Sequence, residues 1–115
     1  VGTNDVLQGS EAGIQTRYQA ILARIPANVE VVMSSIPPLG DVMVNGRKVS
    51  DKNVRDVVAI AKKVCEADKR CRFVNTYEAL STEGKPTQGV LLTDQIHLSP
   101  KGYQLWIEAM RHVQF

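Results

Sequence analysis

Apolar residues recur along two stretches of the chain at the spacing of three and four positions that places them on one face of a helix. Ser10 and Ser50 precede these stretches, and both are suitable N-cap residues. The pattern therefore predicts helices over residues 10–25 and 50–67. Their apolar faces comprise Ile14, Tyr18, Ile21, Leu22 and Ile25 in the first, and Val54, Val57, Val58, Ala61 and Val64 in the second.

A third helical pattern closes the chain. Ser99 is a suitable N-cap, and Pro100 stands at the first helical position, where the N–H that proline lacks would have no partner in the helix. We expect a final helix with one buried face, whose apolar positions are Tyr103, Trp106, Ile107, Met110 and Val113.

Two other segments are rich in β-branched and aromatic residues. Val29–Ile36 is stopped by Pro37 and Pro38, and its apolar character is typical of a strand buried on much of both faces. Residues 72–77 form the second predicted strand. Residues 39–49 have no clear period and are predicted to be an irregular, lid-like loop, and residues 83–86 a turn.

This alternation of helices and strands predicts an α/β domain, with a parallel sheet covered by helices in the doubly wound manner. Val1 is typical of the last residue of a buried strand that runs into a turn. Two strands and this stub cannot bury the apolar faces of three helices. We therefore expect residues 1–115 to be the C-terminal portion of one domain, whose sheet is completed by a missing N-terminal segment or by a second polypeptide.

Cys65 and Cys71 stand where a helix is predicted to end and a strand to begin. A disulfide across this short loop is sterically possible, and so are two separate reduced cysteines that serve as small apolar residues. A structural zinc site is disfavoured, because no histidine accompanies the two cysteines. A disulfide would favour an exported protein, secreted or periplasmic, and without one a cytoplasmic location stays open.

The composition fits a globular protein, with 43% hydrophobic and 23% charged residues among 115. The formal net charge is only +2. Lys69, Arg70 and Arg72 form the one basic cluster, which lacks interleaved aromatic residues and is interpreted as a solvated loop. We therefore expect no nucleic-acid partner. We also expect no membrane span, because no apolar run approaches about 20 residues.

Two short motifs carry the candidate chemistry. Asp94 and His97 are three residues apart just before the final helix, close enough for the carboxylate to orient the imidazole as a general base. Asn4, in Gly2-Thr3-Asn4-Asp5, could donate its side-chain amide to a developing oxyanion. Either motif alone is also explained by turn formation and capping. A metal site at His97 would need a third ligand, and none is identified.

Together and in this order, the two motifs resemble the SGNH/GDSL-type serine ester hydrolases, which have a Gly-x-Asn-Asp block and a later Asp-x-x-His block. The resemblance extends through Asp94–Trp106 and covers essentially the whole chain. It implies a three-layer flavodoxin-like fold, with Asn4 as an oxyanion-hole donor, His97 as the base that activates the nucleophilic serine, and Asp94 as the residue that orients His97. Asp5 would be structural.

The family's Gly-Asp-Ser block, which carries the nucleophile, has no counterpart in this chain. No serine stands in Gly-Asp-Ser or in a Gly-x-Ser-x-Gly elbow, and the chain alone is expected to be nearly inert. Ser10, Ser50 and Ser99 are better explained as N-caps, and Ser34 and Ser35 as strand residues. The remaining serine is Ser81.

The resemblance implies hydrolysis of small carboxylic esters through an acyl-enzyme, with no metal or organic cofactor. Among the ester types that the family accepts, we expect acetyl esters of carbohydrates to be the substrates of this protein. The alternative is a non-catalytic fragment or association module that pairs with another chain through an exposed sheet edge. His112, near the end of the final helix, is assigned no function because its position fits the negative end of the helix dipole.

Overall fold

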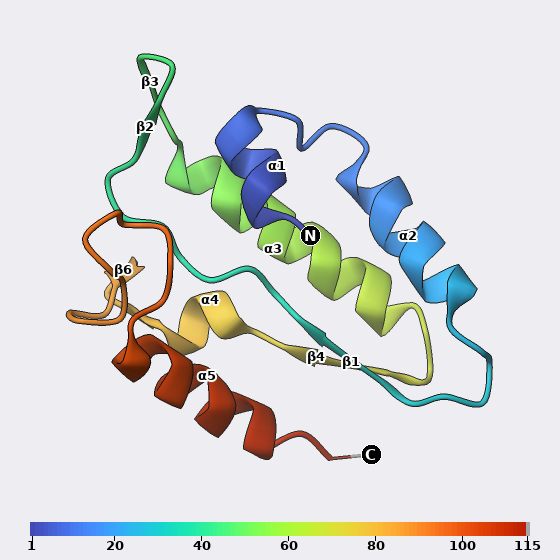
Figure 1. Cartoon of the computed structure of the whole chain (residues 1–115). Helices are drawn as coiled ribbons and strands as arrows, with labels where there is room; N and C mark the ends of the chain where they lie inside the picture. The colour runs from blue at the N-terminus through green and yellow to red at the C-terminus, as the bar shows by residue number, and fades with distance from the viewer. Residues whose placement is uncertain (115) are drawn as a thin grey trace.

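The chain consists of interspersed helices and short strands in the computed structural model, which describes residues 1–114 (Figure 1). The helices are α1 (Thr3–Gln8), α2 (Ile14–Arg24), α3 (Asp51–Glu66), α4 (Thr76–Ala79) and α5 (Pro100–Arg111). The strands are β1 (Val31–Ser34), β2 (Met43–Val44), β3 (Arg47–Lys48), β4 (Cys71–Val74), β5 (Ser81–Thr82) and β6 (Lys85–Pro86).

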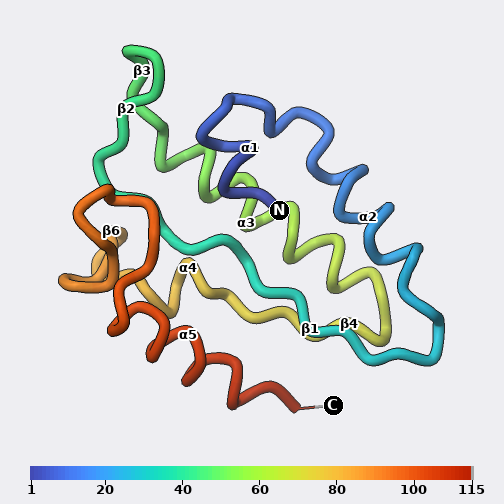
Figure 2. Tube along the Cα trace, viewed as in Figure 1, coloured from blue at the N-terminus to red at the C-terminus, as the bar shows by residue number. Residues whose placement is uncertain are grey.

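The central sheet consists of β1 and β4, which run parallel with Val31 opposite Cys71 and Ser34 opposite Val74. Helix α3 connects the two strands and lies on one side of them together with α2, while α5 lies on the other side (Figure 1). The N-terminal helix α1 lies over α3 (Figure 2). The predicted α/β class, with a parallel sheet between helical layers, is therefore confirmed.

The main core lies between α2 and α3. The predicted apolar face of α3 is buried, as are Ile14, Tyr18 and Leu22 of α2, whereas Ile21 is exposed. Ser50 caps α3 as predicted, because its hydroxyl accepts a hydrogen bond from the backbone N–H of Lys52 at 3.1 Å.

The predicted beginning of α2 is wrong. The helix begins at Ile14 rather than after Ser10, and its N-cap is Gly13, whose φ is 81°. This left-handed conformation suits glycine and interrupts the helical path ahead of Ile14. Ser10 instead donates its hydroxyl hydrogen to Oδ1 of Asp5 at 3.5 Å.

The predicted strand end at Val1 is also wrong. Val1 is exposed and lies in no strand, and the next residues enter α1 instead of an open turn. The residues of β1 are only half-buried, although burial on both faces was expected. Within residues 1–114, β1 pairs only with β4, so its other edge has no paired strand.

The segment predicted as an irregular loop contains a small hairpin. Strands β2 and β3 pair antiparallel, and the turn between them consists of Asn45 and Gly46, both with positive φ. Asn-Gly is the favoured sequence for this kind of tight turn. Strands β5 and β6 form a similar hairpin around Glu83 and Gly84, where a turn was predicted.

Helix α5 begins as predicted, because Ser99 accepts a hydrogen bond from the N–H of Gly102 at 3.2 Å and Pro100 is the first helical residue. The prediction that its apolar stripe is buried is wrong: Tyr103 and Ile107 are exposed and the rest of the stripe is half-buried. The helix packs mainly against the short helix α4, and a two-stranded sheet is too narrow to cover its apolar face.

Cys65 and Cys71 are joined by a disulfide, so the first of the two alternatives is correct. The bond links the last turn of α3 to the first residue of β4, and both cysteines are buried. It therefore fixes the connection between the layer of helices and the sheet.

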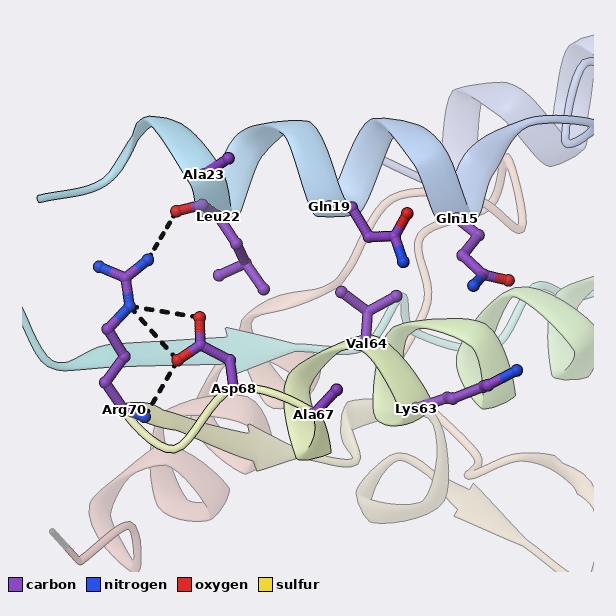
Figure 3. A pocket seen from close by; sticks show the side chains of 9 residues that line it. All are labelled: Gln15, Gln19, Leu22, Ala23, Lys63, Val64, Ala67, Asp68 and Arg70. Carbon is purple, nitrogen blue, oxygen red and sulfur yellow. Dashed lines mark hydrogen bonds and ion pairs between the residues drawn. The ribbon is translucent and has the colours of Figure 1, made fainter. Parts of the chain in front are cut away.

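Arg70 corrects the interpretation of the basic cluster as a solvated loop. Its guanidinium donates to the backbone carbonyls of Leu22 at 2.6 Å and Ile25 at 2.9 Å, and also to that of Pro26. It also pairs with Asp68 (Figure 3). The last carbonyls of a helix lack the full set of partners within the helix, and Arg70 supplies donors to those of Leu22 and Ile25 at the end of α2.

We expect Arg70→Ala to lower the free energy of unfolding by roughly 2 to 4 kcal/mol, because the carbonyls at the end of α2 would lose charged hydrogen-bond donors. The Arg70 side chain is only 19% exposed, so water cannot fully replace it. Chemical denaturation measures the change. Lys69→Ala is the matched control, since Lys69 is exposed; an equal loss in both variants would contradict the capping role.

Candidate active site

The Asp94 carboxylate organises the loop that precedes α5. One oxygen, Oδ1, accepts the backbone N–H groups of Ile96 at 2.9 Å and His97 at 3.0 Å. The other, Oδ2, lies 2.5 Å from Nδ1 of the His97 ring. The carboxylate thereby fixes both the backbone of the loop and the orientation of the imidazole. This is the geometry by which a carboxylate prepares a histidine to act as a base through its other nitrogen.

These hydrogen bonds hold the pKa of Asp94 at about 2, below its ordinary value of 3.8. The largest contribution is the bond to the His97 side chain, followed by the backbone N–H groups of His97 and Ile96. The carboxylate is therefore ionised throughout the neutral pH range.

A titration of Asp94 by carboxyl ¹³C NMR tests this arrangement. Because the pKa is lowered by folding, the interaction is fully present above pH 3.8 and is lost only as the pH falls through about 2. In His97→Ala the midpoint should move up toward 3.8, because the largest cause of the shift is removed. An unchanged midpoint in that variant would mean that the ring does not bind the carboxylate in solution.

Asn4 lies in the first turn of α1, two residues after a constrained glycine. Gly2 has a φ of 115°, and a Cβ atom there would lie 2.5 Å from Cγ2 of Ile36. Only glycine therefore permits this close entry into the helix. The side chain of Asp5 accepts the N–H of Gly2 at 3.1 Å and pairs with Arg17 at 2.8 Å, contacts that make its role structural.

One pocket brings the predicted residues of the two motifs together. Asn4 and His97 both line a cavity of about 290 Å³, while Asp94, which is bonded to the His97 ring, is not among the lining residues. The His97 side chain is 71% exposed. The other lining residues are Thr3, Ser34, Ser35, Pro37, Thr76, Ile96, Leu98, Tyr103 and Trp106.

The hydroxyl groups of this pocket were not predicted as part of the site. Ser34 ends β1 and Thr76 follows β4, so both residues lie at the carboxyl end of the parallel sheet. Ser34 accepts the indole N–H of Trp106 at 3.0 Å, shares a hydrogen bond with Thr76, and donates to the carbonyl of Ser35 at 3.1 Å. Their position after parallel strands is the signal that could have identified them.

None of the serines among residues 1–114 is hydrogen-bonded to His97, whose ring bonds to Asp94. The hydroxyl of Ser34 is already engaged by its neighbours, and Ser99 caps α5. A base acts on a nucleophile within hydrogen-bond reach, so none of these serines is placed to react in this arrangement.

Two of the other cavities among residues 1–114 lie beside features described above. One, of about 320 Å³, lies between α2 and α3 and includes the Arg70–Asp68 pair (Figure 3). The other, of about 750 Å³, lies between the two hairpins and is bounded by Gln95, which precedes Ile96 and His97 in the chain.

Residues 1–114 contain no cluster of three or more histidine, cysteine or acidic residues that could hold a metal ion. In the same part of the chain, no helix is long and apolar enough to cross a membrane.

Comparison with known proteins gives two matches. The model of the GDSL-like lipase/acylhydrolase family matches residues 1–105. A solved structure from Streptococcus pneumonia, described as that of a candidate platelet activating factor, is similar with a TM-score of 0.72 at 20% sequence identity. The similarity covers 96% of this chain and 55% of the other, so this chain spans about half the length of that structure. No curated protein matches the chain.

Proposed function

This chain belongs to the GDSL-like lipase/acylhydrolase family, and on that basis we propose that it carries the base, the orienting acid and an oxyanion donor of a serine ester hydrolase. The observation that carries the proposal is the pocket that His97 and Asn4 both line, with Asp94 bonded to the His97 ring. The family inferred from the two sequence motifs is the one that the comparison gives.

The proposed reaction begins when a serine oxygen attacks the ester carbonyl and His97 accepts the serine proton at Nε2. Asp94 stabilises the imidazolium that forms, and the Asn4 amide donates to the carbonyl oxygen as it becomes negative. The carbon–oxygen bond to the alcohol breaks, and the alcohol leaves with the proton from His97. A water molecule, deprotonated by His97, then hydrolyses the acyl-enzyme to release the acid and restore the serine.

The nucleophilic serine is proposed to lie outside residues 1–115, either in a segment covalently attached to them or in a second polypeptide. Two observations support this. None of the six serines stands in a Gly-Asp-Ser sequence. Among residues 1–114, none is hydrogen-bonded to His97. Residues 1–115 alone are then expected to be nearly inactive, since loss of the nucleophile costs about 10⁶-fold in kcat.

The proposed substrates are small esters, with acetyl esters of carbohydrates preferred. A cavity of about 290 Å³ beside His97 suits a short acyl group better than a long chain. The larger cavity between the hairpins is lined by charged side chains, among them Lys48, Asp51 and Lys85, which suit an alcohol with many hydroxyl groups. No cofactor is proposed.

Hydrolysis of a series of p-nitrophenyl esters and of an acetylated sugar by the intact native protein tests this proposal. We expect acetyl esters to be cleaved faster than octanoyl esters. Equal or faster cleavage of the octanoyl ester would remove the preference for short acyl groups. Failure to hydrolyse any ester would contradict the enzymatic function itself.

A second candidate function rests on the edge of β1, which within residues 1–114 has no paired strand. Such an edge can bind a strand of another chain, as expected of a non-catalytic association module. The ester assay separates the two functions, because an association module would form a complex without turnover.

The proposed location is secreted or periplasmic. The disulfide between Cys65 and Cys71 supports it, since such bonds persist in oxidising compartments.

A further inference from the structure

Gly40 and Gln95 make an unusually close contact between two loops. The backbone N–H of Gly40 donates to the carbonyl of Gln95 at 3.0 Å. A Cβ atom on Gly40 would lie 2.8 Å from Cβ of Gln95 and 2.1 Å from its Oε1. The side-chain oxygen could rotate away, but the Cβ of Gln95 is fixed by the backbone. The hydrogen bond at this distance therefore depends on glycine at position 40.

The loop that contains Gly40 is firmly held on both sides. Pro38 and Leu39 precede it and Val42 follows it, and all three side chains are buried. Leu39 and Val42 belong to the main hydrophobic core. The buried side chains on both sides therefore hold the backbone of Gly40 in place. A side chain added at position 40 cannot easily be accommodated by movement of this loop.

Most hydrogen bonds of the loop that contains the Asp94–His97 pair are made between residues of that loop. The N–H of Leu92 donates to the carbonyl of His97 at 2.8 Å, and the N–H of Gln95 donates to the carbonyl of Leu92 at 2.9 Å. Among residues 1–114, the bond from Gly40 is the only hydrogen bond that joins residues 92–97 to another part of the chain.

The backbone of Gln95 adds a second constraint. Its φ is 63°, in the left-handed region that residues with a side chain rarely adopt. The hydrogen bond from Gly40 holds the carbonyl that follows this unfavourable torsion angle. Without that bond, the turn is expected to relax toward a commoner conformation, and the Asp94 and His97 groups on either side of it would move.

We propose that Gly40 is a positioning residue for His97: by leaving room for Gln95 and donating to its carbonyl, it holds the Asp94–His97 loop in the conformation that aims the imidazole. The structural part of this inference stands independently of catalysis. Its catalytic consequence rests on the proposed ester hydrolase function.

The first test follows the pKa of Asp94 by NMR in Gly40→Ala, Gln95→Gly and the double variant. In Gly40→Ala the pKa should rise from about 2 toward 3.8, because the loop moves and the bond to His97 is weakened. In Gln95→Gly it should stay low, since glycine tolerates the positive φ and keeps the carbonyl. The double variant should also stay low, because the clash with the Gln95 side chain is gone.

Gly46→Ala is the control for general destabilisation. Gly46 has a φ of 75° and no atom near its absent Cβ, so alanine strains the backbone there without touching Gln95. The pKa of Asp94 should be unchanged. A rise in this control equal to that in Gly40→Ala would overturn the proposal, as would an unchanged pKa in Gly40→Ala.

The double variant also decides the case in which Gly40→Ala does not fold. A folded double variant with Asp94 at about 2 supports the proposal, because removal of the Gln95 side chain cures the defect. A double variant that also fails to fold overturns it, since the contact with Gln95 would then not be the cause.

The second test measures turnover in the intact protein that includes the nucleophile. Gly40→Ala should lower kcat by about 10²-fold, the cost of a displacement of about 1 Å. The double variant should recover to the level of Gln95→Gly. If the wild-type protein hydrolyses no ester while the Asp94 pKa responds as described, the proposed function fails and the positioning role stands.

Discussion

Replacement of His97 by alanine should lower kcat for ester hydrolysis by about 10⁶-fold in the protein that contains the nucleophile. Among the described residues that line the pocket with Asn4, His97 supplies the imidazole, the side chain that most often acts as a general base, and its ring is already oriented by Asp94 at 2.5 Å. Folding should be little affected, because the side chain is 71% exposed. Steady-state kinetics and circular dichroism on the same sample measure both effects.

His112→Ala is the matched control for this substitution. His112 is also an exposed histidine, with an exposed fraction of 77%, but it lies at the end of α5 beside Glu108. Its removal should leave kcat unchanged. Normal turnover in His97→Ala, or an equal loss in both variants, would remove His97 from the role of base.

Replacement of Asn4 by alanine should lower kcat by roughly 10²- to 10³-fold with little change in KM. The amide is proposed to bind the oxygen that becomes negative in the transition state, and that charge is absent from the bound ester. The loss should therefore fall on the chemical step. Rates at saturating and at low ester concentration separate the two parameters.

Gln8→Ala provides the comparison, because Gln8 is an exposed polar residue of the same short helix. It should leave both parameters unchanged. A rise in KM with unchanged kcat in Asn4→Ala would mean that the amide binds ester and transition state equally, and would exclude the oxyanion role.

The sequence predicted the parts of the fold that depend on local patterns. Ser50 and the apolar face of α3 appear where the helical spacing put them, and so does the Ser99–Pro100 beginning of α5. The beginning of α2 was predicted wrongly. Ser10 fits the residue preference for an N-cap at least as well as Gly13, which is the N-cap in the structure. Local preference does not decide between them, since the choice depends on the path of the chain out of α1.

Burial was predicted less well than secondary structure, because it depends on neighbours that spacing does not specify. The stripe on α5 has the correct helical period, yet Tyr103 and Ile107 are exposed. Arg70 shows the opposite error. It was interpreted as a solvated surface charge, but a contact across 48 residues of sequence places it against the carbonyl of Leu22.

In the candidate site, the predicted residues came from two motifs, and the structure brings Asn4 and His97 into one pocket although they are far apart in the chain. Ser34 and Thr76 were not predicted, because each is an ordinary residue at a strand end. Gly40 was not predicted either, since its importance arises from the close approach of Gln95, a non-local contact that no short pattern specifies.

We propose that Asp94, His97 and Asn4 act on a serine that lies outside residues 1–115. Labelling of the native protein with a fluorophosphonate, followed by mass mapping of the modified peptide, tests it most directly. We expect one labelled serine in a segment outside residues 1–115, with labelling lost in His97→Ala. Labelling of Ser34 or another serine of this chain would contradict the external nucleophile, and the absence of any labelling would contradict the serine hydrolase mechanism.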